Sequence, residues 1–128
     1  MKRSLLLFLS IAFFVSLGVS AAPYDKDATV LVMRANVARM QTIKTAVAAR
    51  DWNTAAQAFF DYAKAGLAEM AMDPPKGSKE DWITTWQYFV EQAYRGVGTC
   101  AEKDPAKILK ALDDLVAVNK HGHSTFRF

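Results

Sequence analysis

The sequence lacks a pair of cysteines that could cross-link the chain, and it lacks the pattern of paired strands. It contains a single cysteine, Cys100, so no disulfide can form within the chain. No stretch alternates apolar and polar residues as a half-buried strand would, and no Asn-Gly turn that could join two strands is present. Stability must therefore come from helix packing or from a bound group.

Motifs for a protein-borne active site are also missing. The chain has no HExxH, paired CxxC, Walker loop or GxSxG, and no Glu-x-x-His of a carboxylate-bridged di-iron site. Its two histidines, His121 and His123, lie two residues apart, and on a helix such a pair cannot face one metal ion. One cysteine also cannot form the two thioether bonds of a covalent c-type haem. We therefore expect neither an enzyme with its own active site nor a covalently attached haem.

The chain begins with the pattern of a secretory signal. Residues 1–3 are Met-Lys-Arg, residues 5–19 are apolar apart from two serines and a glycine, and residues 19–21 fit a small-residue cleavage site. We predict a signal peptide over residues 1–21, and a mature, periplasmic domain over residues 22–128. An uncleaved anchor is the alternative, although the apolar run is short for the ~20 residues that span a membrane.

The charge of the mature chain excludes two classes of partner. Lys2 and Arg3 are two of the 16 basic side chains, so 14 remain against 13 acidic ones after cleavage. These charges are interspersed along the chain rather than clustered. We therefore expect no nucleic-acid binding and no stable membrane association after cleavage. The remaining ~107 residues suit one domain with one core.

Helix signals fill residues 22–128. We expect helices over about 27–49, 51–70, 78–99 and 104–126, with caps at Asp51 or Asn53, at Ser78 and at Asp104 before Pro105. The predicted inward residues are Val30, Met33, Val37, Met40 and Val47; Ala56, Phe59, Phe60, Ala63 and Leu67; Trp82, Trp86, Phe89 and Ala93; and Ile108, Leu112, Leu115 or Val116, Asn119, His123 and Phe126. Short connections make successive helices antiparallel neighbours, so the predicted fold is all-α, an up-down-up-down four-helix bundle.

This topology brings the start of the first helix and the end of the last helix to the same end of the bundle. At 1.5 Å per residue, Met33 and His123 lie within roughly 10 Å of that end, whereas Met40 lies two turns deeper. A thioether sulfur and an imidazole nitrogen can hold a haem iron from opposite sides. The plainer interpretations are a methionine that fills the core and a solvated or hydrogen-bonded histidine. His121 points to a different face, and Cys100 belongs near the opposite end of the bundle.

The end of the chain resembles a known haem-protein family. Residues 119–127, NKHGHSTFR, resemble the CKxCHxxFR signature of the cytochrome c prime family, with Asn119 and Gly122 in place of its two cysteines. Without those cysteines the stretch is also similar to the HxxYR ending of the related periplasmic four-helix cytochrome b. The segment that contains Met33 is similar to the first helix of the six-coordinate members, in which the aligned methionine is the second ligand. The resemblance covers essentially the whole mature chain.

The resemblance implies a non-covalent haem b whose iron is held by Met33 and His123, and an electron-transfer role with transient redox protein partners. A bundle of this family also allows a homodimer. Residues expected around the macrocycle are Val30, Val37, Trp82, Phe126 and the methionines that end the second helix. Arg127, with Lys76 or Lys79, would pair with the propionates.

Two alternatives from other classes stay open. If Met33 does not bind the iron, a five-coordinate haem would bind nitric oxide or carbon monoxide. The chain could also have kept the bundle and lost the haem, and would then be a periplasmic binding module.

Overall fold

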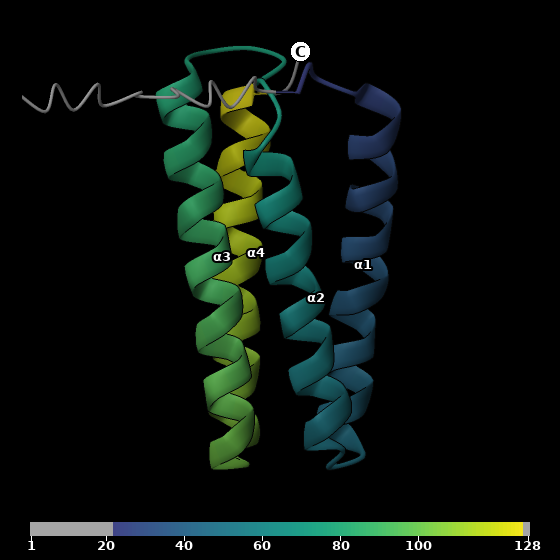
Figure 1. The fold of residues 1–128 in the computed structure, drawn as a ribbon. Helices are drawn as coiled ribbons and strands as arrows, with labels where there is room; N and C mark the ends of the chain where they lie inside the picture. The colour runs from purple at the N-terminus through teal and green to yellow at the C-terminus, as the bar shows by residue number, and fades with distance from the viewer. Residues whose placement is uncertain (1–21, 127–128) are drawn as a thin grey trace, which may run out of the picture.

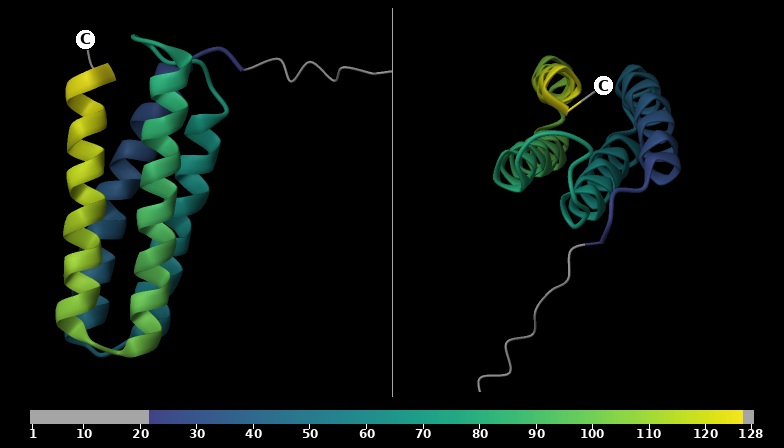
Figure 2. Two further views of the ribbon diagram at one scale, coloured as in Figure 1. Left: turned by 90° about the vertical axis from the view of Figure 1, so that its left-hand side faces the viewer. Right: turned by 90° about the horizontal axis from the view of Figure 1, so that it is seen from above.

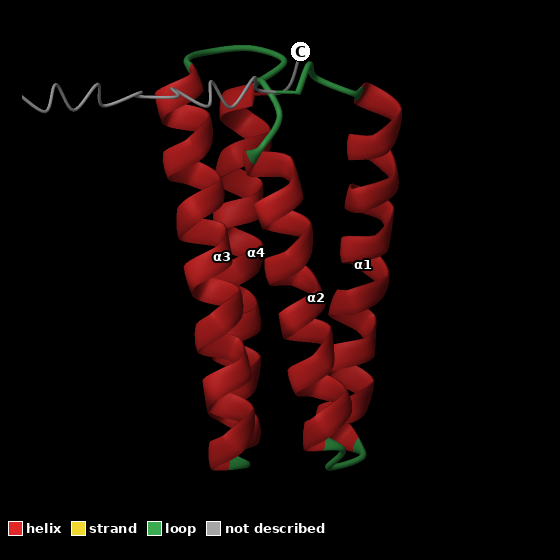
Figure 3. Ribbon diagram, viewed as in Figure 1, coloured by secondary structure: helices red, strands yellow, loops and turns green. Residues whose placement is uncertain are grey.

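The computed structural model describes residues 22–126, so the predicted signal peptide lies outside the described residues. Four helices follow one another: α1 (Lys26–Ala48), α2 (Trp52–Met70), α3 (Lys79–Glu102) and α4 (Pro105–Phe126). They run alternately up and down (Figure 1), and every regular element of the described part is a helix (Figure 3). The predicted all-α four-helix bundle is therefore confirmed. Within residues 22–126 no helix combines the length and the apolar character that crossing a membrane requires.

Side-chain caps determine where the helices begin. The carboxylate of Asp25 accepts a hydrogen bond from the backbone N–H of Ala28, and Asp51 accepts one from Thr54. Ser78 accepts one from Asp81 in the same way. Each acceptor satisfies a first-turn amide that has no partner within its own helix. The caps predicted at Asp51 and Ser78 are thus confirmed, whereas α1 begins one residue before the predicted start.

The bundle is packed most closely between α2 and α3, because α2 presents small residues to its partner. Its buried stripe includes Ala55, Ala58, Ala63, Ala65 and Gly66 around Phe59 and Tyr62. The predicted inward residues Phe60 and Leu67 are instead 42% and 43% exposed, so these two assignments were wrong. Large side chains at the buried alanine and glycine positions of α2 would hold α2 and α3 apart.

Helix α3 continues three residues beyond its predicted end at Thr99, through both of its glycines. Gly96 lies against the ring of Phe59, where an added Cβ would stand 2.2 Å from the Phe59 Cδ1 atom. A residue without a side chain is needed for this close approach, so Gly96 is a packing residue rather than a helix-ending one.

The two halves of α1 are packed differently. The half near Ala48 buries Ile43, Ala46 and Val47, whereas the residues buried in the first half are the polar Thr29 and Asn36. Figure 1 shows α1 diverging from α2 toward its N-terminal end, and Figure 2 shows the four helices following one another around the bundle axis. Of the neighbouring helix pairs, α1 and α4 have the fewest contacts. This sparse packing leaves space at the end of the bundle where α1 begins and α4 ends.

Candidate functional site

A cavity of about 450 Å³ opens at that end of the bundle between α1, α3 and α4. This volume lies within the range of small-molecule and cofactor pockets. Its wall is mainly apolar and aromatic and consists of Tyr24, Lys26, Thr29, Val30, Met33, Pro75, Trp82, Thr85, Trp86, Phe89, Val118, Asn119, Gly122, His123 and Phe126. Met33 and His123, 90 positions apart in the sequence, thus line the same space.

The imidazole of His123 has a buried nitrogen atom that lacks a hydrogen-bond partner within residues 22–126. Its Nε2 atom is buried and has no hydrogen-bond partner among the described residues. A buried polar atom without a partner lowers the stability of the fold by about 1–3 kcal/mol. Such atoms are rare in folded proteins, and those that occur often have a functional role. Nε2 is one of the two histidine atoms that bind metal ions. The side chain is therefore suited to act as an axial ligand to a group that fills the cavity.

Aromatic rings form one continuous side of the cavity. The Trp82 ring packs edge-to-face against Phe126 at 5.0 Å between centroids and against Trp86 at 5.5 Å. The Trp86 ring in turn packs against Phe89 at 5.1 Å. The indole N–H of Trp82 donates to the carbonyl oxygen of Glu69 at 2.9 Å, which satisfies its polar atom and fixes the ring. A flat apolar ligand would find a rigid, water-excluding wall here.

Of the residues predicted around the macrocycle, three, among them Val30, line the cavity, whereas Val37 and the methionines at the end of α2 do not. Trp82 and Phe126 belong to its wall, but Val37 is 64% exposed and lies outside it. The prediction for Val37 was wrong because the buried stripe of α1 passes through its polar neighbour, Asn36. That asparagine is accommodated by hydrogen bonds, since its Oδ1 accepts from Arg39 and its carbonyl oxygen accepts from the Tyr62 hydroxyl.

The cations predicted to bind propionates are placed differently from expectation. Arg127 lies outside the described residues. Lys79 donates to the carbonyl oxygen of Met72 and lies 3.5 Å from the Asp73 carboxylate, and neither it nor Lys76 lines the cavity. The cation at the cavity is Lys26, which sequence reasoning missed. Its spacing of seven residues from Met33, two helical turns, is the signal that could have identified it.

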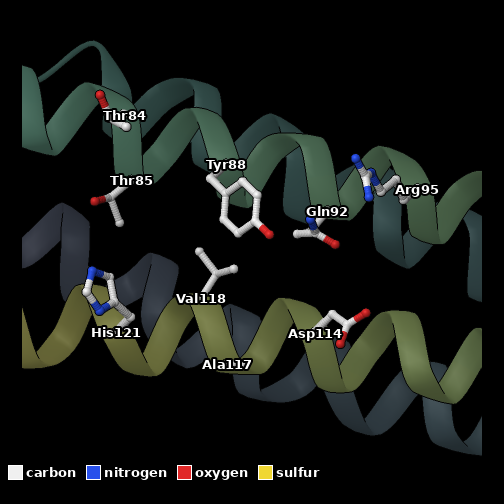
Figure 4. Close-up of a pocket in the computed structure, with 9 residues that line it drawn as sticks. All are labelled: Thr84, Thr85, Tyr88, Gln92, Arg95, Asp114, Ala117, Val118 and His121. Carbon is white, nitrogen blue, oxygen red and sulfur yellow. The ribbon is translucent and has the colours of Figure 1, made fainter.

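The second histidine faces elsewhere, as predicted. His121 is exposed and lines an open groove of about 550 Å³ on the outer side of α3 and α4. Figure 4 shows it on α4, across this groove from Thr85 on α3. Thr85 and Val118 line both the groove and the cavity and so separate the two.

Cys100 is buried far from the candidate site. It lies near the C-terminal end of α3, at the other end of the bundle, and its side chain belongs to the hydrophobic core. Burial raises the pKa of its thiol, which disfavours the reactive thiolate form. Cys100 is therefore a core residue.

One buried acid lies directly behind the cavity wall. Glu69 is 1% exposed, and the hydroxyl of Thr29 donates to its Oε2 atom at 3.0 Å. Burial raises the pKa of Glu69, the Thr29 hydrogen bond opposes this, and the negative charge of Asp25 adds to the rise.

The site residues fit a haem held through axial ligands. A buried, unpartnered imidazole and a thioether line one aromatic-walled cavity, while residues 22–126 contain no cluster of three His, Cys, Asp or Glu side chains that could hold a bare metal ion. The positions that resemble the thioether cysteines, Asn119 and Gly122, are also in the wall. No family model, curated protein or solved structure matches the chain.

Proposed function

We propose that this chain is a periplasmic electron-transfer protein that binds non-covalent haem b between Met33 and His123. The observation that carries the proposal is that these two residues line one apolar cavity in which the Nε2 atom of His123 is buried without a partner. The resemblance of residues 119–127 to the cytochrome c prime and periplasmic four-helix cytochrome b sequences supports the same function. The resemblance supports a periplasmic location too, and so does the signal pattern of residues 1–21.

Haem supplies a one-electron iron couple, and the protein sets how that couple is used. Neutral His123 offers a nitrogen lone pair from α4. Met33 offers a soft, weakly donating sulfur from α1, and a thioether ligand raises the reduction potential. Two protein ligands would leave no open axial position for a gas. This ligand set therefore supports electron transfer by a carrier rather than gas binding or catalysis.

The remaining cavity residues would exclude water and orient the ligand. The ring series from Phe126 through Trp82 to Phe89 covers one side, and Val30 with Val118 adds aliphatic surface. Exposed Lys26 lies at the α1 end of the cavity, where its ammonium group can pair with a propionate. The propionates would then face solvent, and the exposed edge would serve brief encounters with redox proteins.

A second function is favoured by one observation. Met33 lies on the half of α1 that is sparsely packed against α4, so little holds its sulfur at a fixed distance from His123. A five-coordinate haem that binds nitric oxide or carbon monoxide is the function that would follow if the sulfur stayed unbound.

Absorption spectra of the purified mature protein titrated with hemin test the two functions. We expect one haem per chain with a six-coordinate, low-spin ferric spectrum. Met33→Ala should give a five-coordinate, high-spin spectrum, and His123→Ala should weaken haem binding. Met40→Ala is the matched control, because Met40 packs against the hydrophobic core two turns deeper and should leave the spectrum unchanged.

Each function has its own contradictory result. A high-spin ferric spectrum in the unaltered protein would select the gas-binding function. Failure to take up hemin, or an unchanged spectrum in both the Met33 and the His123 variants, would refute the assignment of the site.

A further inference from the structure

Glu69 is a buried acid for which no basic partner is found within the described residues. Its side chain is on α2, is 1% exposed, and makes no ion pair with a lysine, arginine or histidine of residues 22–126. The hydrogen bond from Thr29 supplies one donor to a carboxylate that can accept several. An ionised carboxylate in such a setting is costly unless a positive charge compensates it.

The cavity is a neighbouring space in which such a charge could lie. Thr29, which donates to the carboxylate, is itself part of the cavity wall, and so is Trp82, which donates to the backbone carbonyl of Glu69. One side chain, that of Thr29, thus contacts the carboxyl group and also lines the cavity. Met33 is one helical turn from Thr29 on the same face of α1 and also lines the cavity.

No charged side chain of the described residues at this end forms an ion pair with Glu69. On α1, Asp25 is negative and exposed Lys26 is at the cavity rather than beside Glu69. On α3, Lys79 is engaged with Asp73 and with the Met72 carbonyl. On α4, His123 lines the cavity, where neutral imidazole is the form that binds iron.

We infer that Glu69 is the counter-charge of the redox centre and that reduction of the iron is coupled to proton uptake by its carboxylate. This inference rests on the proposed function. With neutral imidazole and thioether ligands, the ferric porphyrin centre carries one positive charge and the ferrous centre carries none. The Glu69 carboxylate therefore favours the ferric form.

The coupled step balances in electrons and protons. One electron comes from a one-electron donor protein and reduces Fe(III) to Fe(II). One proton comes from a hydronium ion of the solvent: its O–H bond breaks and leaves water, and an O–H bond forms on the Glu69 carboxylate. Burial disfavours the charged carboxylate of Glu69 when no positive charge is near. After reduction has removed the positive charge of the iron centre, the neutral, protonated form of Glu69 is therefore favoured.

Potentiometric titration of the haem-loaded protein over a range of pH tests the inference. In the unaltered protein the equilibrium constant for reduction should fall up to tenfold per pH unit, about 59 mV, while Glu69 titrates. Glu69→Gln should remove this dependence. Its potential should lie above that of the unaltered protein at high pH and meet it at low pH, where both side chains are neutral. A residue with a purely structural role would not produce such convergence.

Asp27→Asn is the matched control, since it removes the same charge from an exposed position in the first turn of α1. Solvent screens that charge, so this variant should follow the unaltered protein. Parallel pH profiles for Glu69→Gln and the unaltered protein would overturn the role of Glu69 and leave haem binding intact. A protein that takes up no haem would overturn both proposals.

Urea unfolding of the haem-free protein provides a readout that does not need haem. Because the pKa of Glu69 is raised, the native state holds this proton more tightly than the unfolded state. Stability should therefore fall as pH rises from the ordinary glutamate range through the raised pKa, by up to about 1.4 kcal/mol per pH unit. Glu69→Gln should lack this loss. Equal pH dependence in both proteins would show that the carboxylate is already compensated and would refute the inference.

Discussion

Replacing His123 by leucine should stabilise the haem-free protein while it removes haem binding. The buried Nε2 atom has no partner among the described residues, and an unpartnered buried polar atom costs about 1–3 kcal/mol. Leucine has a similar volume and no polar atom, so the free energy of unfolding should rise by about that amount. For a domain of this size each kcal/mol raises Tm by roughly 4–8 °C. The usual effect of altering a side chain in a packed interior is the opposite one.

The assay pairs urea unfolding of the haem-free protein with hemin titration. His121→Leu is the matched control, since this histidine lies on the same helix but is exposed in the outer groove. Its change in stability should stay within about 0.5 kcal/mol, and haem binding should be kept. Destabilisation by His123→Leu in the haem-free protein would mean that Nε2 is satisfied, and the main structural argument for a ligand at this position would fail.

Two further predictions follow from individual side chains. The double variant Asn119→Cys, Gly122→Cys, produced in a bacterium that matures c-type cytochromes, should retain haem on a denaturing gel, because both positions line the cavity and a Cβ at Gly122 makes only an ordinary 3.5 Å contact. A folded double variant that releases all of its haem would contradict the placement of the porphyrin. Gly96→Ala should lower the free energy of unfolding by about 1–3 kcal/mol, since its Cβ would overlap the Phe59 ring. Gly98→Ala, with no atom within 4 Å, should raise it by roughly 0.5–1 kcal/mol, and urea unfolding that ranks the two variants otherwise would refute the packing of α2 on α3.

Local chemistry in the sequence was sufficient to predict the bundle. Caps such as Asp51 and Ser78 act over three residues, so they can be identified without knowing what the helix packs against. The convergence of Met33 and His123 was predicted for a related reason. It follows from the number of helices and the shortness of their connections, not from any detail of side-chain packing.

The errors in the predicted core arose where packing overrides hydrophobicity. Val37 and Phe60 are apolar and lie next to the buried stripes, yet the stripes pass through Asn36 and the small residues of α2. The side chain of Asn36 can be buried because its Oδ1 accepts from Arg39, and the Tyr62 hydroxyl of α2 also donates to its backbone carbonyl oxygen. Sequence periodicity carries no information about a partner 26 positions away.

Glu69 was missed for the same reason. Within α2 it is one more polar residue near a helix end, and its significance depends on Thr29, 40 positions earlier in the chain. Burial of an acid becomes apparent only when the neighbouring helix is in place.

The unequal packing of α1 makes the two ends of the bundle differ in stability. The end near Ala48 is tightly packed, and the end where the cavity opens is loosely packed. Amides near Ile43 and Val47, beside the continuous apolar core, should exchange with solvent slowly, and those near Thr29 and Met33 much faster. If the chain binds haem as proposed, it could fold first and take up the haem afterwards, because the loosely packed half of α1 could move while the other three helices stay packed. Closure of that half-helix, rather than folding of the whole chain, would then set the rate at which the cofactor is captured.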